Sequence, residues 1–331
     1  MRLSILDQSP VSSNQTSREA LNHSLKLAQI GESLGYTRYW LTEHHDLQHL
    51  ASSTPEVLLG YIGGHTETIR IGAGAILLPH YRPYKVAEIF NTLATLFPNR
   101  IDLGIGRAPG GSAEATNALS TNYLQKVFAL PELLEELLNF LDGSFPDGHE
   151  FKSLSALPKP EKSATPWLLG TSEKSAKLAA KNGLPYTFGY FMSDNKGTEI
   201  IQTYKDNFVK RYENQEPEVI LTVSVVCAET NKKAEEIALS SLIWSIQKEK
   251  LEDENGVPSI EAAKQYELTD KEKEKFENIK QQMIIGDQKT VKTQLKALEK
   301  EYECDEIMIN TVTYSPDDKF NSYCLIAEVL L

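Results

Sequence analysis

Short runs rich in β-branched and aromatic residues alternate with longer runs of helical periodicity along almost the whole chain, and this alternation constrains the fold most. The eight β-rich runs are residues 3–6, 39–42, 69–77, 101–106, 167–169, 186–191, 219–228 and 306–311. Nearly all of them precede a helical run, such as 17–34 or 290–302. The pattern favours the α/β class, and within it a (β/α)8 TIM barrel over an open doubly wound sheet.

Two stretches interrupt this rhythm. After the fourth strand, an acidic helical run at 131–141 leads into a loop rich in Pro, Ser and Lys. After the seventh strand, residues 247–282 carry dense charge without a clear apolar face. We therefore predict a single barrel domain over residues 1–331 with insertions after strands four and seven. The second insertion is either a mobile lid over the barrel mouth or a solvated decoration.

Charge and cysteine content restrict the partners and the compartment. Asp and Glu number 46 against 34 Lys and Arg, which gives a formal charge of -12 and argues against nucleic acid or anionic lipid as partners. The three cysteines, Cys227, Cys304 and Cys324, form no CxxC pair, as is typical of a reducing compartment. Without an apolar signal segment or membrane span, we expect a cytoplasmic protein.

Strand two ends in Glu43, His44 and His45. Since neighbouring strand residues face opposite sides, at most one of the two histidines points easily into the barrel mouth, where an imidazole suits acid/base chemistry. The alternative is a hydrogen-bonded pair that only ties a loop. A metal site is not expected, because strand one lacks a histidine and the other histidines fit no ligand spacing. His80, after strand three, is a further candidate for the mouth.

Three other strand ends suggest a phosphorylated ligand with a flat ring. The small residues 72–75 in strand three would let a ring system approach the backbone. Strand four ends at Arg107 beside a glycine-rich loop, which suits an anion unless the arginine pairs with a surface carboxylate. Strand five ends at Thr171, Ser172 and Ser175, where a helix N-terminus offers a phosphate seat or ordinary capping.

The chain resembles the bacterial luciferase-like flavin-dependent monooxygenases. The resemblance rests on YWLTEHH at 39–45, IRIGAGAILLPHY at 69–81, RIDLGIGRAPG at 100–110, and Gly-Thr-Ser before a helix that ends in Asn-Gly-Leu-Pro. It extends over nearly the whole chain apart from the two insertions.

The resemblance implies a role for each matching residue. It places His44 near the reactive edge of the flavin, and Arg107, Ser172 and Ser175 at the phosphate of reduced FMN. Ala73 and Gly74 correspond to the peptide against which the isoalloxazine packs. Two further matching positions differ from luciferase, namely Thr171, which replaces a glutamate, and Tyr190, which replaces a tryptophan beside the ring.

The implied activity is oxygenation of a small organic substrate. FMNH2 from a separate NAD(P)H:flavin reductase would react with O2 to a C4a-(hydro)peroxyflavin, and the protein would exclude water and position the substrate. Light emission is not expected. Two alternatives remain open: hydride transfer with the deazaflavin F420, and flavin binding without catalysis. The resemblance also implies a homodimer with His45 and Glu88 near the interface.

Overall fold

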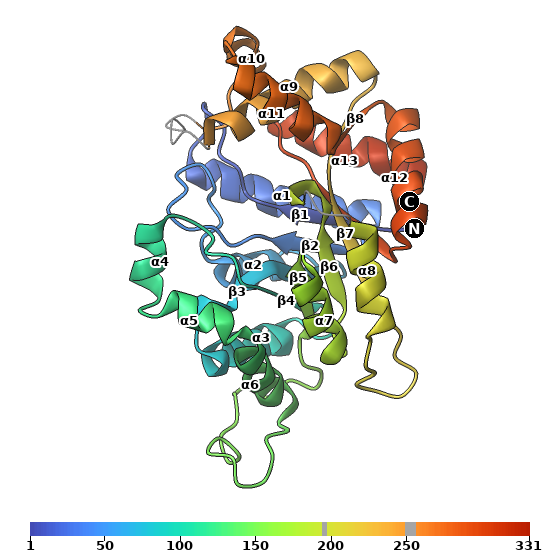
Figure 1. Ribbon diagram of the computed structural model, residues 1–331. Coiled ribbons are helices and arrows are strands. Elements are labelled where there is room, and N and C mark those ends of the chain that lie inside the picture. Colours follow the sequence, from blue (N-terminus) through green and yellow to red (C-terminus); the bar gives the residue numbers. More distant parts are fainter. Residues whose placement is uncertain (194–196, 249–255) are drawn as a thin grey trace.

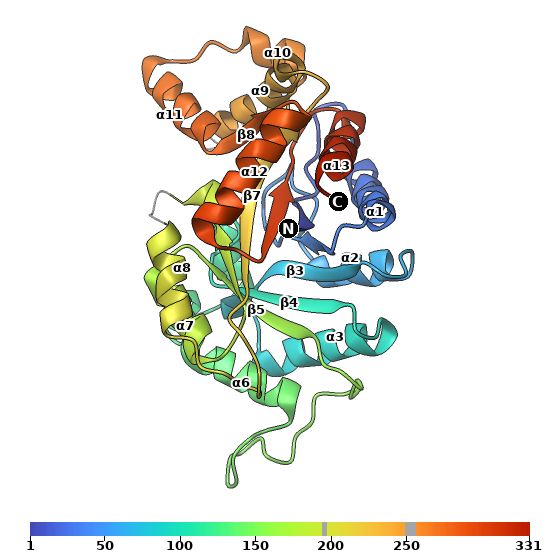
Figure 2. The same ribbon diagram turned by 90° about the vertical axis from the view of Figure 1, so that its right-hand side faces the viewer.

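The computed structural model describes residues 1–193, 197–248 and 256–331, and its strands close into a parallel barrel (Figure 1). The strand order is β6-β5-β4-β3-β2-β1-β9-β7, and pairing of β6 with β7 closes the ring. The helices lie around the outside of the strands (Figure 2). The predicted (β/α)8 barrel is therefore confirmed.

The strands are β1 (Arg2–Asp7), β2 (Arg38–Leu41), β3 (Arg70–Leu77), β4 (Ile101–Gly106), β5 (Thr165–Gly170), β6 (Tyr186–Gly189), β7 (Val219–Cys227), β8 (Met283–Gly286) and β9 (Glu306–Asn310). The helices are α1 (Ser17–Leu34), α2 (Pro55–Gly63), α3 (Pro83–Leu96), α4 (Ala113–Leu119), α5 (Tyr123–Phe128), α6 (Leu130–Asp142), α7 (Glu173–Lys181), α8 (Gly197–Asp206), α9 (Asn231–Gln247), α10 (Ile260–Gln265), α11 (Asp270–Gln281), α12 (Gln288–Tyr302) and α13 (Pro316–Leu330). Two 3-10 turns, η1 (Leu78–His80) and η2 (Tyr190–Met192), follow β3 and β6.

Strand β8 was not predicted. It pairs in parallel with the last four residues of β7, from Ser224 to Cys227, and lies outside the closed ring. Its four residues are too few to display an alternating pattern in the sequence.

The longest connections between consecutive barrel strands follow β4 and β7, where insertions were expected. Within 247–282 the expected absence of an apolar face is wrong, because Ile260, Phe276 and Ile279 pack against a hydrophobic cluster that includes side chains of α9. Residues 249–255 of this stretch lie outside the described residues. No described residue of the stretch lines the cavity presented below, and the lid remains a hypothesis.

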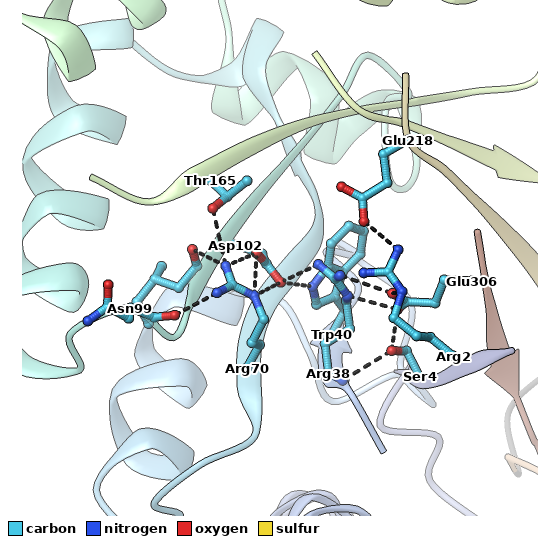
Figure 3. Close-up of polar contacts among 11 residues, drawn as sticks. Arg2, Ser4, Arg38, Trp40, Arg70, Asn99, Asp102, Thr165, Glu218 and Glu306 are labelled. Atoms are coloured by element: carbon cyan, nitrogen blue, oxygen red, sulfur yellow. Dashed lines mark hydrogen bonds and ion pairs between the residues drawn. The ribbon is translucent and has the colours of Figure 1, made fainter. Parts of the chain in front are cut away.

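A buried network of charged side chains fills the N-terminal end of the barrel interior (Figure 3). Arg38 donates to both carboxylate oxygens of Glu306, at 2.8 and 3.0 Å, and to Oδ2 of Asp102 at 3.0 Å. Arg70 also pairs with Asp102, and Trp40 Nε1 donates to it at 3.0 Å. Burial by itself would lower the pKa of Arg38, but the two adjacent carboxylates raise it. This network joins four strands at the end opposite the catalytic face of such barrels.

Replacing Asp102 by alanine is expected to lower the free energy of unfolding by about 3–5 kcal/mol, because it leaves the buried Arg38 short of a partner. Equilibrium unfolding in urea measures this change. Asp102→Asn should lose less, since its amide oxygen still accepts from Trp40 Nε1. A loss below about 1 kcal/mol for the alanine variant, the range of an exposed ion pair, would contradict this account.

The glycines of β3 and β4 serve barrel packing in part. A Cβ on Gly72 would lie 2.7 Å from Trp40 Nε1 and from the backbone oxygen of Asp102. A Cβ on Gly104 would lie 2.2 Å from the backbone oxygen of Ala73. At Gly72 the close approach predicted for residues 72–75 is therefore made by the protein itself, and Gly104 of the neighbouring strand shows the same tight packing.

Among the helices that the structure describes, none has the length and apolar character needed to cross a membrane. Over the same residues, His, Cys, Asp and Glu side chains form no group of three that could hold a metal ion.

Candidate functional site

A cavity of about 880 Å³ opens at the C-terminal ends of the barrel strands. Residues at or just beyond the ends of β2, β3, β4 and β5 line it, and Leu6, Thr222 and Met308 contribute from β1, β7 and β9. Its volume lies within the range of roughly 300–1,000 Å³ that is usual for small-molecule sites. The cavity is thus large enough for a cofactor together with a small substrate.

His44 lines this cavity from the loop after β2. A hydrogen bond of 2.9 Å joins its Nδ1 to Thr42 Oγ1, and its backbone N–H donates to the Ser52 carbonyl at 2.9 Å. These two contacts fix the imidazole, and within the described chain Nε2 has no hydrogen-bond partner. Nε2 is therefore the nitrogen available to a ligand.

The imidazole of His44 is expected to stay neutral at physiological pH. Burial, with smaller contributions from the charges of Lys248 and His45, lowers the pKa of His44 to about 4. Its NMR signals should therefore remain constant over the range of about pH 5 to 8 in which free histidines titrate. They should shift only as the pH falls towards 4. A midpoint near 6.5, the ordinary value, would contradict this effect of burial on the pKa of His44.

His45 lies behind the cavity wall rather than in it. Its Nε2 is 2.8 Å from Glu43 Oε1, and the same carboxylate accepts from Tyr81 Oη at 2.7 Å and from the Leu77 amide at 3.0 Å. His80 does not line the cavity either, because its Nε2 bonds to the Pro109 carbonyl at 2.9 Å. One histidine of the pair therefore faces the cavity, as the strand geometry predicts.

Arg107 lines the cavity at the end of β4 with an exposed side chain. In the described chain its guanidinium forms no ion pair or hydrogen bond, so the alternative of a surface carboxylate partner is not observed there. The glycines that follow have a packing role, since a Cβ on Gly111 would lie 1.9 Å from the His45 carbonyl oxygen. The charge of Arg107, rather than the glycine loop, is the feature that suits an anion.

Thr171, Ser172 and Ser175 line the cavity between β5 and the first turn of α7. Ser172 is the N-cap, accepting from the Ser175 amide at 3.4 Å, and Ser175 Oγ donates to the Ser172 carbonyl at 2.7 Å. Ordinary capping is therefore present. This capping leaves other backbone N–H groups in the first turn of α7 without intrahelical acceptors. These N–H groups can donate hydrogen bonds to an anion bound beside Arg107.

Ala73 and Tyr190 do not lie where the sequence suggested. Ala73 is buried in the hydrophobic core, whereas Gly74, the other residue expected at the ring, lines the cavity together with Ala75. The pairing of β3 with β4 shifts register between Ala73 and Ile76. The peptide between Gly74 and Ala75 is cis.

Strand β6 ends at Gly189, two residues earlier than predicted, and η2 follows it. The turn directs Tyr190 against Tyr302, with ring centroids 5.6 Å apart, while Phe191 and Met192 line the cavity.

The cavity extends outwards past residues that the strand ends did not reveal. On α7 these are Lys174, Lys177, Leu178 and Lys181, and opposite them stand Val127, Phe128, Leu130 and Pro131 at the junction of α5 and α6. The sequence did contain a sign of this extension, because the spacing of the three lysines at i, i+3 and i+7 places them on one face of the predicted helix.

Comparison with known proteins identifies the family. A family model described as luciferase-like monooxygenase matches residues 1–302. The uncharacterized protein YceB of Bacillus subtilis (strain 168) is 40% identical over 331 residues, with 100% of both chains covered. N-acetyl-S-alkylcysteine monooxygenase of the same organism is 36% identical, covering 100% of this chain and 98% of its own. The chain belongs to the luciferase-like monooxygenase family, whose named members are oxidoreductases.

Solved structures agree with this assignment. The crystal structure of apo-MsnO8 has a TM-score of 0.89 and 32% identity, covering 99% of this chain and 97% of its own. Two more distant structures share the fold alone. They are the oxygenating constituent of 3,6-diketocamphane monooxygenase in complex with FMN, at TM-score 0.73 and 18% identity, and an F420-dependent secondary alcohol dehydrogenase, at 0.68 and 16%.

Proposed function

We propose that this protein is the oxygenase of a two-component flavin monooxygenase, which takes reduced FMN from a separate reductase and oxygenates a small organic substrate with O2. The observation that carries the proposal is the meeting of Arg107 and the start of α7 at adjacent strand ends of one cavity, on the same cavity as His44. Both features attract a phosphate, and the cavity has room for a ring system beside it.

The residues present fit FMN on geometric grounds. Arg107, Ser172 and the first-turn amides of α7 would hold the phosphate, with Thr171 contributing beside them. The ring would rest on the small residues Gly74 and Ala75, which line the cavity. When bound, reduced FMN supplies the electrons with which O2 is activated for transfer of one oxygen atom to the substrate.

The chain's own residues then have defined tasks. Neutral His44 presents Nε2 to the cavity, where it can donate or accept a hydrogen bond at the reacting oxygen. Leu6, Leu169 and Met308 form an apolar floor that limits the approach of water. Ring orientation of His44 is set by Thr42, which is therefore a positioning residue.

The choice between FMN and F420 is tested by anaerobic titration of the protein with each reduced cofactor. We expect binding of reduced FMN, and consumption of O2 with product formation when a reductase and NADH are supplied. Tight binding of F420 with hydride transfer to an alcohol or ketone would favour the deazaflavin alternative. Binding of FMN with no product from aldehydes, sulfonates or sulfides would favour a non-catalytic flavin carrier. The name of the 36% identical relative makes N-acetyl-S-alkylcysteines the first substrates to test.

We further propose a homodimer formed through the side of α2 and α3. Helix α2 exposes Val57 and Tyr61, with 66% and 43% of their surface accessible, and the half-buried Glu88 of α3 pairs with Lys85 at 3.2 Å. Light scattering at micromolar concentration should give twice the chain mass, and Val57→Asp should shift the mass towards the monomer. A monomer in the unaltered protein would contradict the proposal.

A further inference from the structure

A groove leads from the flavin-sized cavity to the surface between α7 and the junction of α5 with α6. Helix α6 packs mainly on α3, and α7 packs mainly on α8. The space between α6 and α7 is therefore not closed by direct packing of these two helices. Figure 1 shows α5, α6 and α7 on the same side of the barrel. The two walls of this α6–α7 groove come from different elements and differ in chemistry.

The α5–α6 wall is apolar. Val127, Phe128, Leu130 and Pro131 line it, and Phe128 keeps 84% of its surface accessible. An aromatic side chain this exposed gains little from folding, because almost none of its apolar surface leaves water. Contact with a ligand in the groove would cover it.

The α7 wall is cationic. Lys177 pairs with Glu173 at 2.5 Å, whereas Lys174 and Lys181 form no ion pair with any residue that the structure describes. Lys174 stands in the first turn, where the helix dipole disfavours a cation, so an anionic ligand would stabilise it there. These lysines stand out in a chain whose formal charge is -12.

Lys181 is too far along α7 to serve the same anion as Ser172. Eight residues separate it from Glu173, the first residue of the helix, which corresponds to about 12 Å along the helix axis. A second negative charge is needed to engage Lys181. A lysine in the last turn of α7 is stabilised by the helix dipole. This stabilisation does not explain why Lys181 lines the cavity.

We propose that the α6–α7 groove binds the substrate, and that the substrate is an organic acid with an alkyl or aryl body whose carboxylate meets Lys181. The apolar body would cover Phe128 and its neighbours, with the end to be oxygenated directed into the barrel towards His44. This inference rests on the proposed function, because it assigns the Arg107 end of the cavity to the flavin phosphate.

The test compares 11-(methylthio)undecanoic acid, whose carboxylate and sulfur stand at opposite ends of an alkyl chain, with its methyl ester, which has the same body without the charge. Calorimetric titration of the FMN-free protein should give an acid that binds about fivefold tighter than the ester, the size of one partly exposed ion pair. Lys181→Met should weaken acid binding by about fivefold and leave ester binding unchanged. Raising the salt concentration should reduce the preference for the acid in the unaltered protein.

Two control variants separate a binding role from a structural one. Lys181→Arg keeps the charge and should retain the preference, and Lys232→Met removes an exposed lysine on α9 that does not line the cavity. Equal binding of acid and ester, failure of both to bind, or an equal effect of Lys181→Met on both would overturn the inference. FMN affinity should be the same in all variants. A protein that keeps the acid preference but fails to bind FMN would contradict the flavin proposal instead.

Discussion

Replacing Arg107 by alanine is expected to weaken FMN binding by roughly ten- to a hundredfold, the largest effect on affinity of any single substitution at this site. The guanidinium is a cavity-lining cation with no ion pair in the described chain, so a bound phosphate would supply its charge-assisted hydrogen bonds. Loss of such contacts costs about 1.5–3 kcal/mol. Quenching of FMN fluorescence measures the dissociation constant for the oxidised cofactor, and anaerobic titration measures it for the reduced one.

Arg82→Ala is the matched control. Arg82 is also exposed, but it precedes α3 and does not line the cavity, so its removal should leave FMN affinity unchanged. An Arg107→Ala protein that binds FMN as tightly as the unaltered one would contradict the assignment of the phosphate end. A loss that occurs equally in both variants would indicate a general effect of charge instead.

Replacing His44 by alanine is expected to lower product formation by about a hundredfold or more while O2 consumption continues as peroxide release. The expectation follows from the position of a neutral imidazole on the cavity wall, where one proton-transfer group contributes about 10²- to 10⁴-fold. FMN affinity and the unfolding midpoint should change little, because among the residues that the structure describes the His44 side chain forms a single hydrogen bond, to Thr42.

The measurement follows product, O2 and peroxide together in the presence of a reductase. His65→Ala controls for loss of a histidine outside the cavity, since the His65 imidazole is exposed and its hydrogen bond among the described residues is to the Tyr61 carbonyl. If His44→Ala forms product with the same yield per O2 consumed, His44 has no part in the chemistry. If it loses FMN binding as well, its role is in the cofactor site.

The position of the site could be predicted from the sequence because parallel strands place their C-terminal ends on one face. His44, Arg107 and Ser172 follow the second, fourth and fifth β-rich runs, and the barrel brings all three to one cavity. The number and order of the strands were sufficient to predict that these three residues lie close together. The roles of the residues at the flavin came from the family resemblance.

Details that depend on local departures from regular strands could not be predicted. The shift in register after Ala73 and the early end of β6 at Gly189 each change which side chains face the cavity. Neither departure leaves a trace in hydrophobic alternation. The lysines of α7 were visible as a helical face, but only the tertiary arrangement shows that this face borders the cavity.

The central claim is that this protein transfers an oxygen atom from O2 with reduced FMN, and isotopically labelled O2 tests it most directly. The protein, FMN, NADH and a flavin reductase would be incubated with N-acetyl-S-hexylcysteine under labelled O2, and the product analysed by mass spectrometry. We predict one labelled oxygen atom in each product molecule, with product strongly reduced in the Arg107→Ala and His44→Ala proteins. Recovery of all consumed O2 as peroxide with thioether, aldehyde and sulfonate substrates, or a product without label, would contradict the account.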